Sequence, residues 1–147
     1  MLVVANYVPG SWLTGWDNLH PEWDPLYDLW RSFNSVWQEH QGLGLLGGMA
    51  HAADLPRQVV VALLSLVLPR SLIRYSLLWS MLLVGAIGCY RLFGWLFTNQ
   101  REHITAKTAA LAAALFYLLN LGTVQNFYVA FEPFYWFYGM LPWLLYY

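Results

Sequence analysis

The chain has 147 residues, of which 59% are hydrophobic, 18% aromatic and only 10% charged, with a formal net charge of −1. An average soluble domain carries about 25% charged residues, and nine Trp, ten Tyr and eight Phe are typical of a membrane protein with many rings at the lipid–water interface. The charge balance excludes a basic nucleic-acid surface, and the single cysteine, Cys89, excludes an internal disulfide.

Both ends of the chain indicate a fragment. Residues 1–13 are expected to be the end of a truncated first span, because their apolar part, LVVANYV, is shorter than the about 20 residues of a spanning helix. The chain stops inside another apolar run, LPWLLYY. We therefore expect further spans beyond these residues.

An external acidic loop is predicted over residues 14–71, and it opens with TGWDNLHPEWDP. Asp17 is the predicted catalytic residue, since a carboxylate partly shielded by tryptophan at a membrane surface has a raised pKa and suits a general base. The alternative is that Asp17 caps a local turn in water. His20 and Glu22 are predicted substrate-binding residues, although solvated loop side chains are the common case for both.

No metal ligand is assigned in this loop. The spacing of His20, Glu22 and Asp24 is not one of the specific metal-binding patterns. Hard oxygen ligands of this type do hold Mg²⁺, Mn²⁺ or Ca²⁺ in other proteins, so a divalent cation stays open as a cofactor.

Two helices are predicted within the loop. Asp24-Pro25 is a helix start, and the apolar spacing after it predicts an amphipathic helix over 25–40, with its Trp-rich side in the membrane surface. A Gly-rich link follows that lacks the Gly-Lys-Ser/Thr of a phosphate loop. Within this link His51 is a predicted substrate contact, or else it orders the link. A short juxtamembrane helix is expected over 56–69.

Three membrane helices are predicted, at 72–97, 106–122 and 134–147. Gly85 and Gly88 provide a small-residue face for close packing, and Arg74 is expected to extend to the membrane interface. The link before the last span returns to the side of the acidic loop. It carries Asn126 and Glu132, which are predicted to bind substrate or to cap helices.

The order of these parts resembles the GT-C class of polytopic membrane glycosyltransferases. More narrowly, it is similar to the N-terminal membrane region of arabinofuranosyltransferase-like proteins of bacterial envelopes. The likeness covers nearly the whole chain and is carried by GWDNLHPEWDP, WQEHQGLGLLGGMAHAADLPR, LIRYSLLWSMLLVGAIGCYRLF and NFYVAFEPFYWFYGMLPWLL.

The resemblance implies an all-α, multi-pass protein of the bacterial plasma membrane with its acidic loop outside. It also implies a polyprenyl-phosphate-linked sugar donor, a glycan or lipid acceptor, and inversion at the anomeric carbon with Asp17 as the base. The chain departs from the family in having Asp17-Asn18 in place of an acidic pair. The fragment alone is expected to be inactive, since later spans would complete the donor site.

The alternative function is that of a non-catalytic polytopic protein, such as a transporter or flippase subunit or an envelope assembly factor. A transporter is expected to carry ionisable residues inside its spans. The predicted spans have no acids between their ends, which favours the enzyme. A helical protein outside the membrane, with an unusually apolar core, is a third reading.

Overall fold

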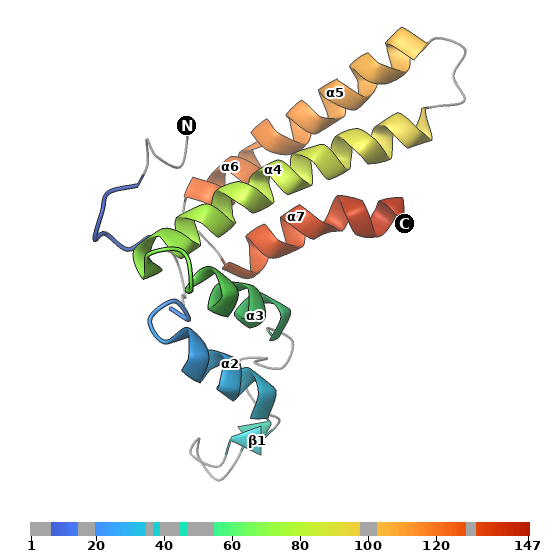
Figure 1. Cartoon of the computed structure of the whole chain (residues 1–147). Coiled ribbons are helices and arrows are strands. Elements are labelled where there is room, and N and C mark those ends of the chain that lie inside the picture. Colours follow the sequence, from blue (N-terminus) through green and yellow to red (C-terminus); the bar gives the residue numbers. More distant parts are fainter. Residues whose placement is uncertain are drawn as a thin grey trace. The chain divides into compact units, whose positions relative to one another are not determined.

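The computed structural model describes residues 7–14, 20–34, 37–38, 45–46, 55–97, 103–128 and 132–147. These ranges form an all-α protein, as the sequence predicts (Figure 1). They contain six helices and one pairing of two-residue strands, and helix α6 lies where a link between two spans was expected. The elements are α2 (Pro25–Asn34), β1 (Trp37–Gln38), β2 (Leu45–Leu46), α3 (Leu55–Leu64), α4 (Arg70–Leu96), α5 (His103–Leu119), α6 (Leu121–Tyr128) and α7 (Glu132–Tyr146).

The chain divides into two compact units, and the division falls within α4 after Arg74. We call Leu19–Arg74, together with Val8–Ser11, the loop unit. Tyr75–Tyr147, together with two N-terminal segments, is called the helical unit. Each unit is described by itself.

In the loop unit, α2 packs against α3. The helix starts where the sequence predicts, because the Asp24 carboxylate accepts a hydrogen bond of 3.2 Å from the Tyr27 amide and Pro25 takes the first helical position. It was expected to continue to His40 but ends at Asn34. Beyond it, Trp37 and Gln38 pair antiparallel with Leu46 and Leu45. This pairing uses backbone groups that a longer helix would need for its own hydrogen bonds.

The second helix of the loop unit is also shorter than expected. Whereas the sequence suggested a helix over 56–69, α3 ends at Leu64 and a turn leads into α4. Proline explains the interruption, since the residue before a proline is disfavoured in helical conformation and Pro69 directly precedes the first residue of α4. Helix α3 thus connects to α4 through a tight turn.

Helix α4 is the one described helix that is long and apolar enough to cross a membrane by itself. Its 27 residues extend over about 40 Å at 1.5 Å per residue. Residues 106–119 of α5 and helix α6 meet the same test as a pair bent by 43°. Three spans were expected; the described residues provide one, or two if the bent pair is counted, and a buried core helix would satisfy the same criteria.

The core of the helical unit is formed where α4, α5 and α7 meet. The prediction that another helix packs closely against the small residues of α4 is confirmed. A Cβ atom added to Gly85 would lie 2.5 Å from the Tyr138 ring, and one added to Gly88 would lie 2.6 Å from the Trp143 indole. The buried hydrophobic side chains of this core are Leu77, Leu78, Met81, Cys89, Leu92, Ala110, Ala114, Tyr135 and Tyr138.

Asn120 lies between α5 and α6, at the bend of 43°. Its side-chain oxygen accepts a hydrogen bond from the Thr123 amide, and its side-chain nitrogen contacts the carbonyl oxygens of Phe116 and Tyr117. The Tyr117 and Tyr138 rings stack at 4.3 Å, and each hydroxyl donates to the backbone carbonyl of the other residue. The bend is therefore a hydrogen-bonded structure that also fixes α7.

Candidate functional site

The most ordered polar feature of the acidic segment is a buried ion pair between Glu22 and Arg74. Arg74 Nε donates to Glu22 Oε1 at 3.0 Å, and Nη2 donates to Oε2 at 3.2 Å. The Arg74 side chain is 3% exposed and the Glu22 side chain 1% exposed. Two parallel bonds of this kind match the planar guanidinium to the planar carboxylate. Both charges are removed from water, and the pair geometry offsets that cost.

A second contact joins the segment around Glu22 to the start of α4. Arg70, the first residue of α4, donates from Nη1 to the Trp23 carbonyl oxygen at 2.8 Å. The Trp23 amide in turn donates to the His20 carbonyl oxygen at 3.0 Å. Residues 20–25 are therefore a tight turn, closed by Asp24 at the start of α2 and held against the first residues of α4.

His20 lies beside the ion pair and responds to its charges. Partial burial lowers the pKa of its imidazole below the ordinary value of 6.5; the positive charge of Arg74 lowers it further and Glu22 opposes the shift. The neutral imidazole is thus favoured at neutral pH. A neutral imidazole has one donor nitrogen and one acceptor nitrogen, a combination that suits a hydroxyl group.

The geometry gives Glu22 an anchoring role. Both of its carboxylate oxygens accept hydrogen bonds from Arg74, so direct contact with a substrate would require this pair to open. From the sequence, Glu22 had no predicted structural role and Arg74 was expected to extend to a membrane interface. In the structure, Arg74 is buried among protein atoms instead.

The other predicted site residues are placed as follows. Asp17 and His51 lie outside the described residues. Glu132 is the first residue of α7, and its side chain is also outside them. Asn126 lies on α6, where its side-chain nitrogen donates to the Gly122 carbonyl oxygen at 2.8 Å. Of the five residues predicted to bind substrate, the structure brings His20 and Glu22 together in the loop unit.

Among the residues that the structure describes, no group of three or more His, Cys, Asp or Glu side chains could hold a metal ion. His20 and Glu22 are close, but the Glu22 oxygens are already bonded to Arg74. The described residues therefore give no donor set through which a cation could be placed.

Sequence reasoning missed the role of Arg74. The sequence did contain one signal: Glu22 had no evident structural partner, and Arg74 lay at the start of a long apolar segment. An acidic and a basic side chain that are both costly to leave unpaired near a membrane are candidates for pairing. Glu22 and Arg74 are 52 positions apart in the chain, so whether they meet depends on the fold.

No protein-family model, no curated protein and no solved structure matches this chain.

Proposed function

We propose that this chain is the N-terminal part of a GT-C-like membrane glycosyltransferase of the bacterial plasma membrane. It would transfer a sugar from a polyprenyl-phosphate donor to an envelope glycan or lipid acceptor on the external face. Asp17 is the catalytic base in this proposal.

The observation that carries the proposal is the attachment of the acidic segment to the first residues of α4. The Glu22–Arg74 pair and the Arg70–Trp23 contact hold residues 20–25 at the N-terminal end of α4, the one described helix that is long enough to span by itself. If α4 crosses the membrane, this end lies at a membrane surface. A polyprenyl-phosphate donor presents its sugar at that same surface, since its isoprenoid chain stays in the lipid.

The proposed chemistry is a single displacement. The Asp17 carboxylate takes the proton of an acceptor hydroxyl, and the hydroxyl oxygen forms a bond to the anomeric carbon of the donor sugar. The bond between that carbon and the phosphate oxygen breaks, and polyprenyl phosphate leaves with the electron pair. Attack from the face opposite the phosphate inverts the anomeric configuration. In this proposal His20 binds a substrate hydroxyl through its neutral imidazole, the form that partial burial favours.

The apolar helices support an enzyme over a transporter. Helices α4, α5 and α6 contain no Asp or Glu, whereas the proton relays of pumps and transporters use chains of Asp, Glu and His inside their spans. The acidic residues are instead concentrated before α4, where six of the eight lie within the first 54 positions.

Sugar transfer in membranes that contain the full gene product tests the proposal. The probe is radiolabelled decaprenyl-phosphoryl-arabinofuranose, with total envelope lipids and glycans as acceptors. Because a general base contributes about 10²- to 10⁴-fold, Asp17→Asn should reduce transfer at least about 100-fold while the amount of protein in the membrane stays the same.

Asp28→Asn is the matched control. Asp28 lies on α2 in a partly exposed pair with Arg31 at 3.7 Å, and its variant should retain full transfer. Normal activity of Asp17→Asn would overturn the catalytic assignment. Absence of transfer above membranes without the protein would overturn the proposed reaction with this donor.

A further inference from the structure

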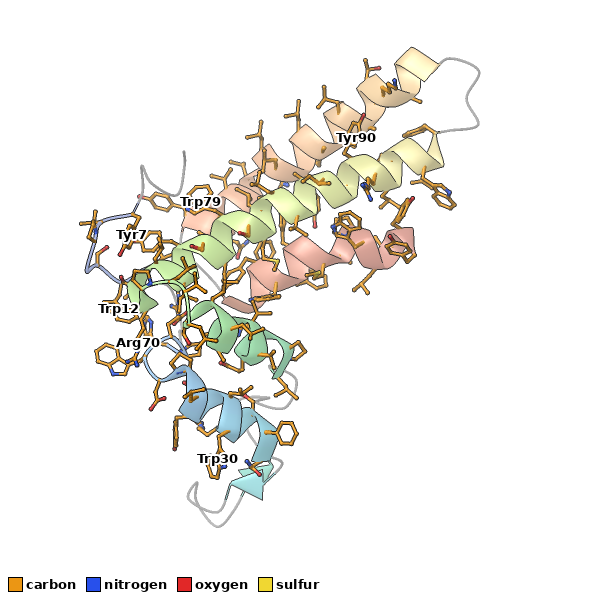
Figure 2. All side chains as sticks on the ribbon, viewed as in Figure 1. Tyr7, Trp12, Trp30, Arg70, Trp79 and Tyr90 are labelled. Atoms are coloured by element: carbon orange, nitrogen blue, oxygen red, sulfur yellow. The ribbon has the colours of Figure 1, made fainter. Side chains whose placement is uncertain are left out.

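One side of α2 consists of large apolar side chains that the protein leaves uncovered. We call this surface the aromatic face of α2, and its members are Trp23, Leu26, Tyr27, Trp30 and Phe33. Each is more than half exposed; Trp30 is 62% and Phe33 75% exposed. Figure 2 shows the Trp30 side chain projecting from α2 on the side away from α3.

The packing of α2 is the reverse of that in an ordinary amphipathic helix. Its buried residues are Pro25 and Ser32, which lie about 100° and 120° around the helix from Leu26 at 100° per residue. A surface helix of a globular protein turns its apolar stripe toward the core. In α2 the apolar stripe faces outward, and the two buried residues are a proline and a serine.

We propose that the aromatic face of α2 lies in the interface of the lipid bilayer that α4 enters, at the level of the headgroups. The proposal rests on the membrane location of the proposed function and is independent of its chemistry. It assigns α2 as an in-plane helix that holds the acidic segment at a fixed height above the hydrocarbon.

The position of this face along the chain indicates lipid as its partner. Its first residue, Trp23, is bound through its carbonyl oxygen to Arg70, the first residue of α4, at 2.8 Å. The aromatic face therefore begins at the end of α4 where a membrane surface would lie. Arg70 itself is exposed, as expected for a side chain that extends toward phosphate headgroups.

The residue types of the aromatic face agree with a position at the level of the lipid headgroups. Two tryptophans and one tyrosine belong to the class that is enriched at membrane–water interfaces, because one end of each ring is apolar and the other forms hydrogen bonds. Leu66 and Val67, in the turn that leads into α4, are 79% and 82% exposed. Uncovered aliphatic side chains in a turn directly before the apolar helix are also explained by contact with lipid.

Spin labels on the full chain, reconstituted into vesicles of phosphatidylethanolamine and phosphatidylglycerol, test the proposal. Leu26→Cys and Phe33→Cys place labels on the aromatic face, and Cys89→Ala removes the native thiol. Asp28→Cys is the control, because Asp28 lies on the opposite side of the helix, about 200° from Leu26 at 100° per residue. Accessibility to oxygen, which concentrates in lipid, is compared with accessibility to a water-soluble nickel chelate.

Labels at positions 26 and 33 should be more accessible to oxygen than to nickel, and the order should reverse at position 28. Equal preference for nickel at all three positions would mean that the face is in water. Low accessibility to both reagents at 26 and 33 would mean that protein covers it, either a partner or a second copy. Either result overturns the proposal. No sugar substrate is involved, so a failure of the Asp17 assignment leaves this measurement unchanged.

Discussion

The carboxylate of Glu22 and the guanidinium of Arg74 are 52 residues apart in the chain, yet they share two hydrogen bonds of 3.0 and 3.2 Å in a site that excludes water. This relationship converts a loop of acidic residues into a fixed turn at the start of α4. It also separates the acids by role, since Asp24 caps α2 and Glu22 anchors the turn.

Glu22→Gln should destabilise the loop unit strongly. Removing one charge of a buried pair leaves the other uncompensated and costs about 3–5 kcal/mol. The double variant Glu22→Leu/Arg74→Met should recover most of this loss, because no buried charge remains. Thermal unfolding in detergent, followed by circular dichroism, measures both variants.

The control for that comparison is Asp28→Asn, which removes a partly exposed pair and should change the free energy of unfolding by less than about 1 kcal/mol. If Glu22→Gln melted like the unmodified chain, the buried pair would not contribute to stability.

Gly85→Ala should weaken the contact between α4 and α7. The added Cβ would lie 2.5 Å from the Tyr138 ring and 2.9 Å from the Tyr138 carbonyl oxygen, and overpacking of this kind costs about 1–3 kcal/mol. Gly94→Ala, in the same helix, is the matched control because nothing lies within 4 Å of its added Cβ. It should stabilise the helix by up to about 1 kcal/mol. Equal effects of the two substitutions on thermal unfolding would argue against the close approach.

Asn120→Ala should loosen the bend between α5 and α6. The variant loses the bond from the Thr123 amide at 3.0 Å and the contacts to two backbone carbonyls, and loss of a helix cap costs about 0.5–2 kcal/mol. Asn126→Ala is the control, since its side-chain nitrogen donates to the Gly122 carbonyl oxygen four residues earlier. Hydrogen exchange of the α6 amides should rise in the first variant and stay unchanged in the second; faster exchange in both would contradict a specific role of Asn120.

The stability of the loop unit should fall as the pH drops below about 6.5. Burial lowers the pKa of His20 in the folded chain, with Arg74 adding to the shift, so the unfolded chain binds the proton first. The contribution of neutral His20 to stability is present above 6.5, the pKa in the unfolded chain. It is lost as the pH falls toward the lower pKa in the folded chain. His20→Gln should reduce this pH dependence in thermal unfolding. An identical pH profile for both chains would exclude His20 as its source.

Cysteine labelling should fix the sidedness of α4. In the Cys89→Ala background, a membrane-impermeant maleimide added to intact cells should modify His20→Cys and leave His103→Cys unmodified, because the two positions flank α4. Both sites should react after the cells are opened. Labelling of position 103 alone in intact cells would place the acidic segment inside.

The sequence by itself determined the helices and several of their boundaries. Local signals were sufficient for the start of α2, where Asp24 and Pro25 act within one turn, and for the extent of α4, where a long apolar run excludes other structures. The start of α2 and the extent of α4 depend on neighbours in the chain, so the order of residues is enough to predict them. Residue size predicted a close-packing face at Gly85 and Gly88, although its partners, Tyr138 and Trp143, are more distant in the chain.

Only the tertiary structure decided where α2 ends and what Glu22 does. Helix α2 stops before the pairing of Trp37 with Leu46. The Glu22–Arg74 pair joins residues whose separation in sequence carries no distance information. Such contacts depend on how distant segments meet, and that is set by packing of the whole unit and not by local propensity.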